Sequence, residues 1–273
     1  MRYVMEACFE AGVEVIVLDR PNPLGGLKIA GPMIDQEWIS YVGAFPMPFV
    51  HGMTIAEIAI WAKKTKGILK IDDKIRKKGK LSILPMIDWT RSMTWPETNL
   101  KWYPTSPNIP TLDAVAGYPM TGLGAQLGDF HHGIGTKHPF RFLTFKNKSA
   151  EELKSALEQL NLAGLSYKIL TLENAEGKPV TGVYLVISDW SSWEPTELAF
   201  VMMSLSAKWQ TPSPFIGVKT SEANLFNKHV GSTEWWNYIQ KAKQNIDPHK
   251  FKLKWENEVS QFRSSIQPFL LYP

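Results

Sequence analysis

One short apolar run constrains the fold of this chain more than any other feature. VEVIVLD, at residues 13–19, is rich in β-branched side chains, and such runs are typical of strands buried on both faces of a parallel sheet. The run ends in Asp19, and Arg20 and Asn22 follow in a loop with two prolines and two glycines. Ligands of open α/β sheets bind at the carboxyl ends of strands, so this cluster predicts a binding site.

A second apolar run repeats the pattern. LSILPMID, at residues 81–88, is followed by a short polar stretch that contains Arg91. The carboxyl ends of parallel strands meet at one edge of their sheet. We therefore expect the loop at 20–26 and the loop at 88–91 to face one cleft.

Helical patterns account for much of the remaining chain. Thr54 and Glu57 form a T-x-x-E capping box, in which each side chain satisfies a free backbone N–H at a helix start, and Ser149 and Glu152 form a second one. Residues 96–140 are rich in turn signals and aromatic residues without clear periodicity, which predicts an ordered, functional loop region. We expect helices at 3–12, 51–64, 149–165, 194–209 and twice near the C-terminus, and a further strand at 181–189.

These elements predict an α/β protein in two parts. A mostly parallel sheet domain with the cleft loops occupies residues 1–144, and a smaller C-terminal α/β domain occupies residues 145–273. A helix followed by a strand is the second half of a βαβ unit. We therefore expect the first domain to be incomplete at its N-terminus.

Composition excludes several classes of protein. The chain is 44% hydrophobic and 21% charged, as soluble globular proteins are, and no apolar run approaches the roughly 18 residues of a membrane span. Charges at Arg2 and Glu6 exclude a signal peptide at the start. The single cysteine, Cys8, excludes an internal disulfide and is expected to be a buried, inert thiol.

The net charge of +4 does not indicate a nucleic-acid-binding protein. Residues 63–80 hold nine Lys or Arg and two Asp, a local balance of +7, so the rest of the chain carries −3. We interpret this segment as a solvated helix end and loop; the alternative is a weak patch for polyanions or a membrane surface. The eleven tryptophans are more informative, because aromatic faces pack well on sugars; the alternative is that most of them fill the core.

Several distinctive motifs follow one another along the chain. They are VLDRPNPLGGLKIAGPMI, YVGAFPMPFVHGMTIAEIA, DWTRSM, LKWYPTSPNIPTLDAVAGYP, GIGTKHPF and the terminal FLLYP. In sequence and spacing they resemble the NamZ (YbbC-like) exo-β-N-acetylmuramidases, glycoside hydrolase family 171, and the similarity extends over nearly the whole chain. The resemblance implies a Rossmann-like domain, a smaller C-terminal domain, and a cleft between them.

The resemblance also implies an activity and a set of substrate contacts. Family members release N-acetylmuramic acid from the non-reducing ends of peptidoglycan fragments. Arg20 would bind the lactyl carboxylate of that sugar through two parallel hydrogen bonds, and Asn22 would form hydrogen bonds with acetamido or hydroxyl groups. Alternatively, Asp19 and Arg20 pair with each other or cap backbone groups. The expected substrate-binding residues are Asp19, Arg20, Asn22, His51, Arg91, Asn108 and Thr136.

Two departures from the family pattern concern catalysis. Family members carry a longer N-terminal region than this chain shows. Their loop after the YPG motif contains a glutamate, whereas here that position falls at Gly124 or Ala125, and a family arginine is replaced by Ile134. Glycoside hydrolysis ordinarily requires two carboxyl groups that flank the bond.

The segment GDFHHG offers substitutes for the missing glutamate. Asp129, His131 and His132 are titratable, and imidazole acts as acid or base near neutral pH. A structural role in the loop is the alternative. The spacing is not a metal signature, and we expect neither a metal nor a cofactor.

Two functions follow as hypotheses. The chain is a glycosidase acting on peptidoglycan-derived saccharides, or it is a non-catalytic amino-sugar-binding protein that keeps the cleft without the catalytic carboxylates. The resemblance implies a periplasmic or cell-envelope location, although no export signal is visible. Nothing in the sequence indicates nucleic acid, a transmembrane segment or a particular oligomeric state.

Overall fold

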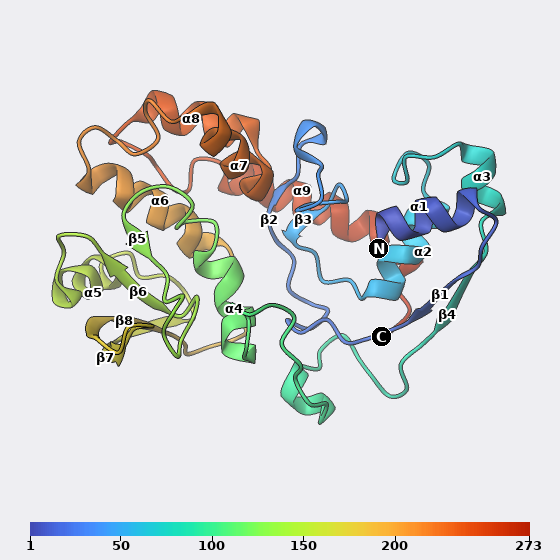
Figure 1. Cartoon of the computed structure of the whole chain (residues 1–273), viewed down its shortest axis with the longest axis horizontal. Coiled ribbons are helices and arrows are strands. Elements are labelled where there is room, and N and C mark those ends of the chain that lie inside the picture. The colour runs from blue at the N-terminus through green and yellow to red at the C-terminus, as the bar shows by residue number, and fades with distance from the viewer.

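A computed structural model describes residues 1–273 of the chain. Figure 1 shows α1–α3, β1 and β4 gathered at one end and β5–β8 with α4–α6 at the other. The long helix α9 (Lys252–Ile266) runs back between them, and both termini lie at the first end. None of the helices combines the length and the hydrophobicity that a membrane crossing requires.

The predicted parallel strands are present and adjacent. They are β1 (Val15–Leu18) and β4 (Leu81–Leu84), and they pair in parallel from Val15 opposite Leu81 to Leu18 opposite Leu84. One face of this sheet packs on α1 (Arg2–Glu10) and α2 (Ile55–Lys64) in a core that includes Val17. The sequence therefore predicted the local topology correctly.

The sequence predicted that the first strand is buried on both faces of the sheet, and this prediction was wrong for one face. Ile16 is 63% exposed and Leu18 is 65% exposed, and Leu84 beside them is 61% exposed. The reason is that the sheet has only two strands, and no helix covers its second face. Only the face toward α1 and α2 is buried.

The middle of the molecule joins the two ends. β2 (Ala30–Met33) and β3 (Pro48–Val50) form an antiparallel pair, and α9 packs along β2. From α9, Phe262 and Ile266 enter the core beneath α1 and α2. The basic segment at 63–80 forms the end of α2 and the short helix α3 (Asp73–Lys78).

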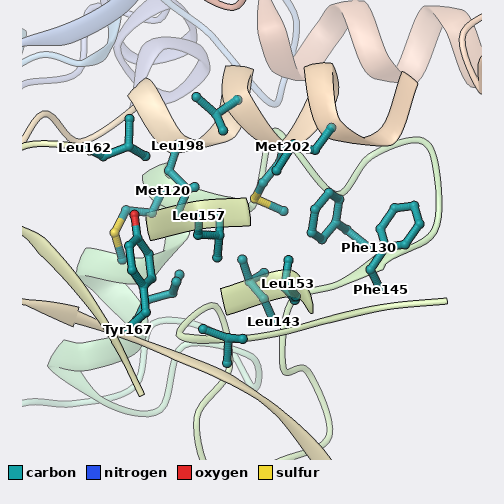
Figure 2. Close-up of a cluster of buried hydrophobic side chains, with 14 of the residues drawn as sticks. Met120, Phe130, Leu143, Phe145, Leu153, Leu157, Leu162, Tyr167, Leu198 and Met202 are labelled. Carbon is teal, nitrogen blue, oxygen red and sulfur yellow. The ribbon is translucent and has the colours of Figure 1, made fainter. Parts of the chain in front are cut away.

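The second end is built on an antiparallel sheet with the order β5-β6-β8-β7. Figure 2 shows its core, where Leu143 and Leu153 meet Met202 from α6. The strands are β5 (Phe130–His131), β6 (Phe142–Phe145), β7 (Leu165–Glu173) and β8 (Pro179–Ile187), and the helices are α4 (Leu112–Thr121), α5 (Ala150–Glu158) and α6 (Glu197–Trp209).

A third core lies among α6, α9 and the pair α7 (Thr220–Val230) and α8 (Thr233–Ala242). Seven of the eleven tryptophans are buried, among them Trp193 and Trp235. Most of the tryptophan excess is therefore structural. Cys8 is half-buried on α1.

Candidate functional site

A cavity of about 800 Å³ lies at the carboxyl end of β1. Its walls come from five places: the loop after β1, the β2–β3 region, the start of α2, α4, and the end of α7. Its polar and charged side chains are Arg20, Asn22, His51, Thr54, Tyr118, Lys228 and His229. None of the lining residues is an aspartate or a glutamate.

The two loops predicted to share a cleft do lie together. β1 and β4 are parallel, so their carboxyl ends point to the same edge. The backbone N–H of Gly26 donates to the carbonyl oxygen of Arg91 at 2.7 Å, which fastens the first loop to the second. However, only the first loop contributes residues to the cavity.

Asp19 anchors the first loop to the start of α2. Its carboxylate accepts hydrogen bonds from the Thr54 hydroxyl at 2.7 Å and from the Ala56 backbone N–H at 2.9 Å. A carboxylate at a helix N-terminus also interacts favourably with the helix dipole. Asp19 therefore caps backbone and hydroxyl groups, does not pair with Arg20, and does not line the cavity.

Arg91 is the centre of a buried ion pair rather than part of the cavity wall. Its guanidinium lies 2.8 Å from the carboxylate of Glu57, and the two residues are 8% and 0% exposed. It also donates to the carbonyl oxygens of Gly26 and Gly52. Gly52 has a φ of +65°, a conformation that glycine adopts readily and other residues avoid. These contacts hold the loops on both sides of the cavity.

The last residues of the chain complete this support. The Leu271 N–H donates to the Glu57 carboxylate at 2.9 Å, and the Tyr272 hydroxyl donates to Asp19 at 2.6 Å. The Pro273 carbonyl accepts the Arg91 N–H at 2.8 Å. Burial, together with the hydrogen bond to Asp19, raises the pKa of Tyr272 to about 12. Sequence reasoning assigned no role to this tail, and only the motif FLLYP pointed to it.

Arg20 is the one predicted contact whose charged group stays free inside the cavity. It is exposed, and its side chain makes no ion pair or hydrogen bond with the rest of the chain. Asn22 also lines the cavity, but both the donor and the acceptor of its side-chain amide already form hydrogen bonds within the chain. Its Nδ2 donates to the Met53 carbonyl at 3.1 Å, and its Oδ1 accepts from the Leu24 N–H at 3.0 Å.

His51 enters the cavity as a neutral imidazole. Burial lowers its pKa from 6.5 to about 4. Its Nδ1 accepts a hydrogen bond from the Met53 N–H at 3.1 Å, so the ring proton lies on Nε2. His51 therefore offers one N–H donor and no charge at neutral pH.

Tyr118, Lys228 and His229 are cavity residues that the sequence analysis missed. Tyr118 comes from α4 and its ring packs against Phe49 at 5.7 Å, and burial raises its pKa. Lys228 and His229 come from the end of α7, more than 200 positions after Arg20 and Asn22 in the loop after β1. The motif GYP marked Tyr118, whereas nothing local marked the α7 residues.

The GDFHHG residues lie outside the cavity. Asp129 and His131 are exposed at β5, and His131 accepts from the Gly133 N–H at 3.2 Å. His132 stacks on Phe140 at 4.8 Å, and burial lowers its pKa to about 4. A sugar in the cavity would therefore not touch these side chains. No three Asp, Glu, His or Cys side chains are grouped as metal ligands.

Asn108 and Thr136 are also outside the cavity lining. Asn108 is exposed in a tight turn closed by a bridge between Ser106 and Ile109. Thr136 donates to the Gly133 carbonyl at 2.8 Å and supports its own loop.

The chemistry of the cavity is that of a site for an anionic, hydroxyl-bearing ligand. Arg20 and Lys228 supply positive charge, and His51 and Tyr118 supply neutral hydrogen-bonding groups. A planar guanidinium binds a carboxylate through two parallel hydrogen bonds. No lining residue supplies the pair of carboxyl groups that ordinary glycoside hydrolysis uses.

Comparison with known proteins gives matches at both ends of the chain. A model for the N-terminal part of the exo-β-N-acetylmuramidase NamZ matches residues 1–113, and the model for its C-terminal part matches residues 116–272. The peptidoglycan β-N-acetylmuramidase NamZ of Bacillus subtilis (strain 168) is 35% identical over 200 residues. The match covers 71% of this chain and 45% of that relative, so the chain spans about half the length of the relative.

Two solved structures share the fold. The crystal structure of a DUF1343 family protein from Bacteroides fragilis NCTC 9343 matches with a TM-score of 0.86 and 29% identity, over 98% of this chain and 69% of that one. A second DUF1343 family protein from the same strain matches with a TM-score of 0.66 and 22% identity, over 100% and 70%. The α/β architecture with separate parallel and antiparallel sheets is thus that of solved proteins.

Proposed function

Because the chain belongs to the NamZ family of exo-β-N-acetylmuramidases, we propose that it acts on peptidoglycan fragments and releases N-acetylmuramic acid from their non-reducing ends. In this proposal the 800 Å³ cavity holds that sugar. Its volume falls within the range of about 300–1,000 Å³ found for small-molecule sites.

One observation carries the proposal for the cavity. Arg20 presents a free guanidinium there, and no carboxylate of the lining competes for it. N-acetylmuramic acid carries a lactyl carboxylate, which N-acetylglucosamine lacks. Arg20 would bind that carboxylate through its planar fork, and the site would thereby select between the two amino sugars.

Neighbouring groups fit the rest of the sugar. The Nε2–H of His51 would donate to a hydroxyl or acetamido oxygen, and the Tyr118 hydroxyl would do the same from α4. Asn22 would act mainly by holding the loop, because its amide already bonds to Met53 and Leu24.

A second function is favoured by the absence of carboxylates in the lining. A chain that binds the sugar without hydrolysing it needs Arg20 and the hydrogen-bonding groups but no acid–base pair. Asp129 and His132 would support the hydrolytic function only if their loop reached the bound fragment.

Turnover and binding distinguish the two functions. The chain is incubated with a chromogenic N-acetylmuraminide, and binding of N-acetylmuramic acid is titrated in parallel. Release of the chromophore supports hydrolysis, and its loss in Asp129→Asn would assign a role to that loop. Saturable binding without release supports the binding function, and absence of both refutes the proposal.

The proposal includes a cell-envelope location, since peptidoglycan lies there. A relative that acts on peptidoglycan is also compatible with cytoplasmic recycling of wall fragments. Fractionation of the native host tests it. Recovery of the protein in the periplasmic or envelope fraction is expected, and recovery in the cytosol alone would contradict it.

A further inference from the structure

A second cavity, of about 280 Å³, lies between β2, the start of α6 and α9. It shares no lining residue with the cavity that holds Arg20. Its polar and charged lining residues are Glu194, Thr196, Glu197, His249, Lys252, Glu256 and Arg263. A different ligand chemistry is therefore expected here, because three carboxylates line this cavity and none lines the other.

Protein partners neutralise only one of these carboxylates. The Glu197 carboxylate lies 3.4 Å from the Lys252 ammonium and 3.5 Å from the His249 Nδ1. Glu194 and Glu256 make no ion pair and no side-chain hydrogen bond within the chain. Two carboxyl groups of the cavity thus remain available to a ligand.

A hydroxyl that faces the cavity also lacks a protein partner. Thr196 as a residue is only 4% exposed, its hydroxyl makes no hydrogen bond within the chain, and its oxygen stays accessible from the cavity. Opposite it, Gly31 has a φ of +89°, and a Cβ there would lie 3.2 Å from the Thr196 Cγ2. The hydroxyl is therefore free to form a hydrogen bond with a ligand atom at this point.

An aromatic wall completes the cavity. Phe200 and Trp255 line it, with ring centroids 4.5 Å apart. Aromatic faces attract cations through their quadrupole, and the attraction increases when the cation is desolvated. Unpaired carboxylates beside aromatic faces can therefore bind a small cationic group.

The charges around Glu194 are mixed, with two ammonium groups and two carboxylates near it. Burial raises the pKa of Glu194 to about 7, although the residue keeps access to solvent, and the neighbouring Glu197 and Glu256 raise it further while Lys28 and Lys252 oppose them. The Lys28 ammonium donates to the carbonyl oxygens of Ser191 and Trp193 and does not bond to Glu194. A bound cation would relieve the repulsion among the carboxylates.

We propose that this second cavity binds a primary ammonium group, held by Glu194 and Glu256, with Thr196 accepting one of its hydrogens and the aromatic wall at its side. Such an ammonium occurs at the end of a lysine-like peptide side chain and on an amino sugar without its acetyl group. The cavity volume accommodates either group.

Calorimetric titrations with matched probes test this. Nα-acetyl-L-lysine amide is compared at pH 7 with the same molecule acetylated on Nε, and D-glucosamine is compared at the same pH with N-acetylglucosamine. The lysine ammonium keeps its charge at pH 7 because its pKa is about 10.4. Saturable binding of the free amines is expected, with at least about tenfold weaker binding of the acetylated partners. The tighter of the two free amines identifies the source.

Variants locate the binding. Glu194→Gln and Glu256→Gln should each weaken binding of the lysine amide about tenfold or more, because a charge-assisted hydrogen bond is lost. The matched control is Glu222→Gln, an exposed glutamate on α7 without an ion pair, and it should leave binding unchanged. Binding to the wild type should strengthen from pH 6 to pH 8, as Glu194 ionises, and should vary less in Glu194→Gln.

Several results would overturn the proposal. These are the absence of saturable binding by both free amines, equal binding of the acetylated and free probes, and equal losses in Glu194→Gln and Glu222→Gln. Unchanged thermal unfolding of the two cavity variants shows that a loss of binding does not come from misfolding.

Discussion

Replacing Arg91 with methionine should destabilise the chain strongly. The substitution keeps an unbranched side chain but removes a guanidinium that is 8% exposed and lies 2.8 Å from the Glu57 carboxylate. Glu57 is 0% exposed and would keep only the backbone N–H groups of Thr54 and Leu271. Breaking a buried ion pair on one side costs about 3–5 kcal/mol, because the remaining charge is uncompensated.

Urea-induced unfolding measures this change, as a lower midpoint with an unchanged slope. Arg20→Met is the matched control, since Arg20 is exposed and unpaired, and it should change the free energy of unfolding by less than about 0.5 kcal/mol. Combining Glu57→Gln with Arg91→Met should recover part of the loss, because no uncompensated charge remains. A loss below about 1 kcal/mol in Arg91→Met, or a loss equal to that of the control, would refute the reasoning.

Three further predictions concern Tyr272, His51 and Gly117. Tyr272→Phe removes the hydroxyl that donates to Asp19 and should lower the free energy of unfolding by about 1.5–3 kcal/mol in urea titrations. Burial lowers the pKa of His51 to about 4, so the neutral imidazole stabilises the folded chain fully above about pH 6.5, and this contribution is lost as the pH falls toward 4. Between pH 6.5 and pH 4 the melting temperature of His51→Gln should therefore fall less than that of the wild type. Gly117→Ala would place a Cβ 2.5 Å from the Phe140 carbonyl oxygen. It should lower the free energy of unfolding by about 1–3 kcal/mol, measured as a lower melting temperature.

Local signals in the sequence predicted the helix starts well. The capping boxes of Thr54 with Glu57 and of Ser149 with Glu152 are both present, because a cap depends on residues three positions apart. That β1 and β4 belong to one parallel sheet was also predicted, since both runs have the composition of parallel strands; their direct pairing was not.

Features that depend on distant residues were not predicted. Glu57 was expected only as a cap, yet it also receives Arg91 and the Leu271 N–H from the end of the chain. The helix α4 was missed because Gly117 and Pro119 lie inside it, and both residues disfavour helix interiors. Such contacts and exceptions are decided by tertiary packing, which periodicity does not encode.

The candidate site was predicted in part for the same reason. Arg20, Asn22 and His51 line the cavity because they follow strands or precede α2, where polar residues gather at the sheet edge. Arg91 has the same kind of position in the sequence but turns inward to Glu57. The direction of a long side chain depends on its partners, and the sequence alone did not reveal them.

The central claim is that Arg20 binds the lactyl carboxylate of N-acetylmuramic acid. Calorimetric titration of the wild type, Arg20→Ala and Arg20→Lys with N-acetylmuramic acid and with N-acetylglucosamine tests it most directly. The account predicts that Arg20→Ala weakens N-acetylmuramic acid binding roughly ten- to a hundredfold, that Arg20→Lys recovers only part of it, and that N-acetylglucosamine binding stays unchanged. Equal losses for both sugars, or no loss for either, would contradict it.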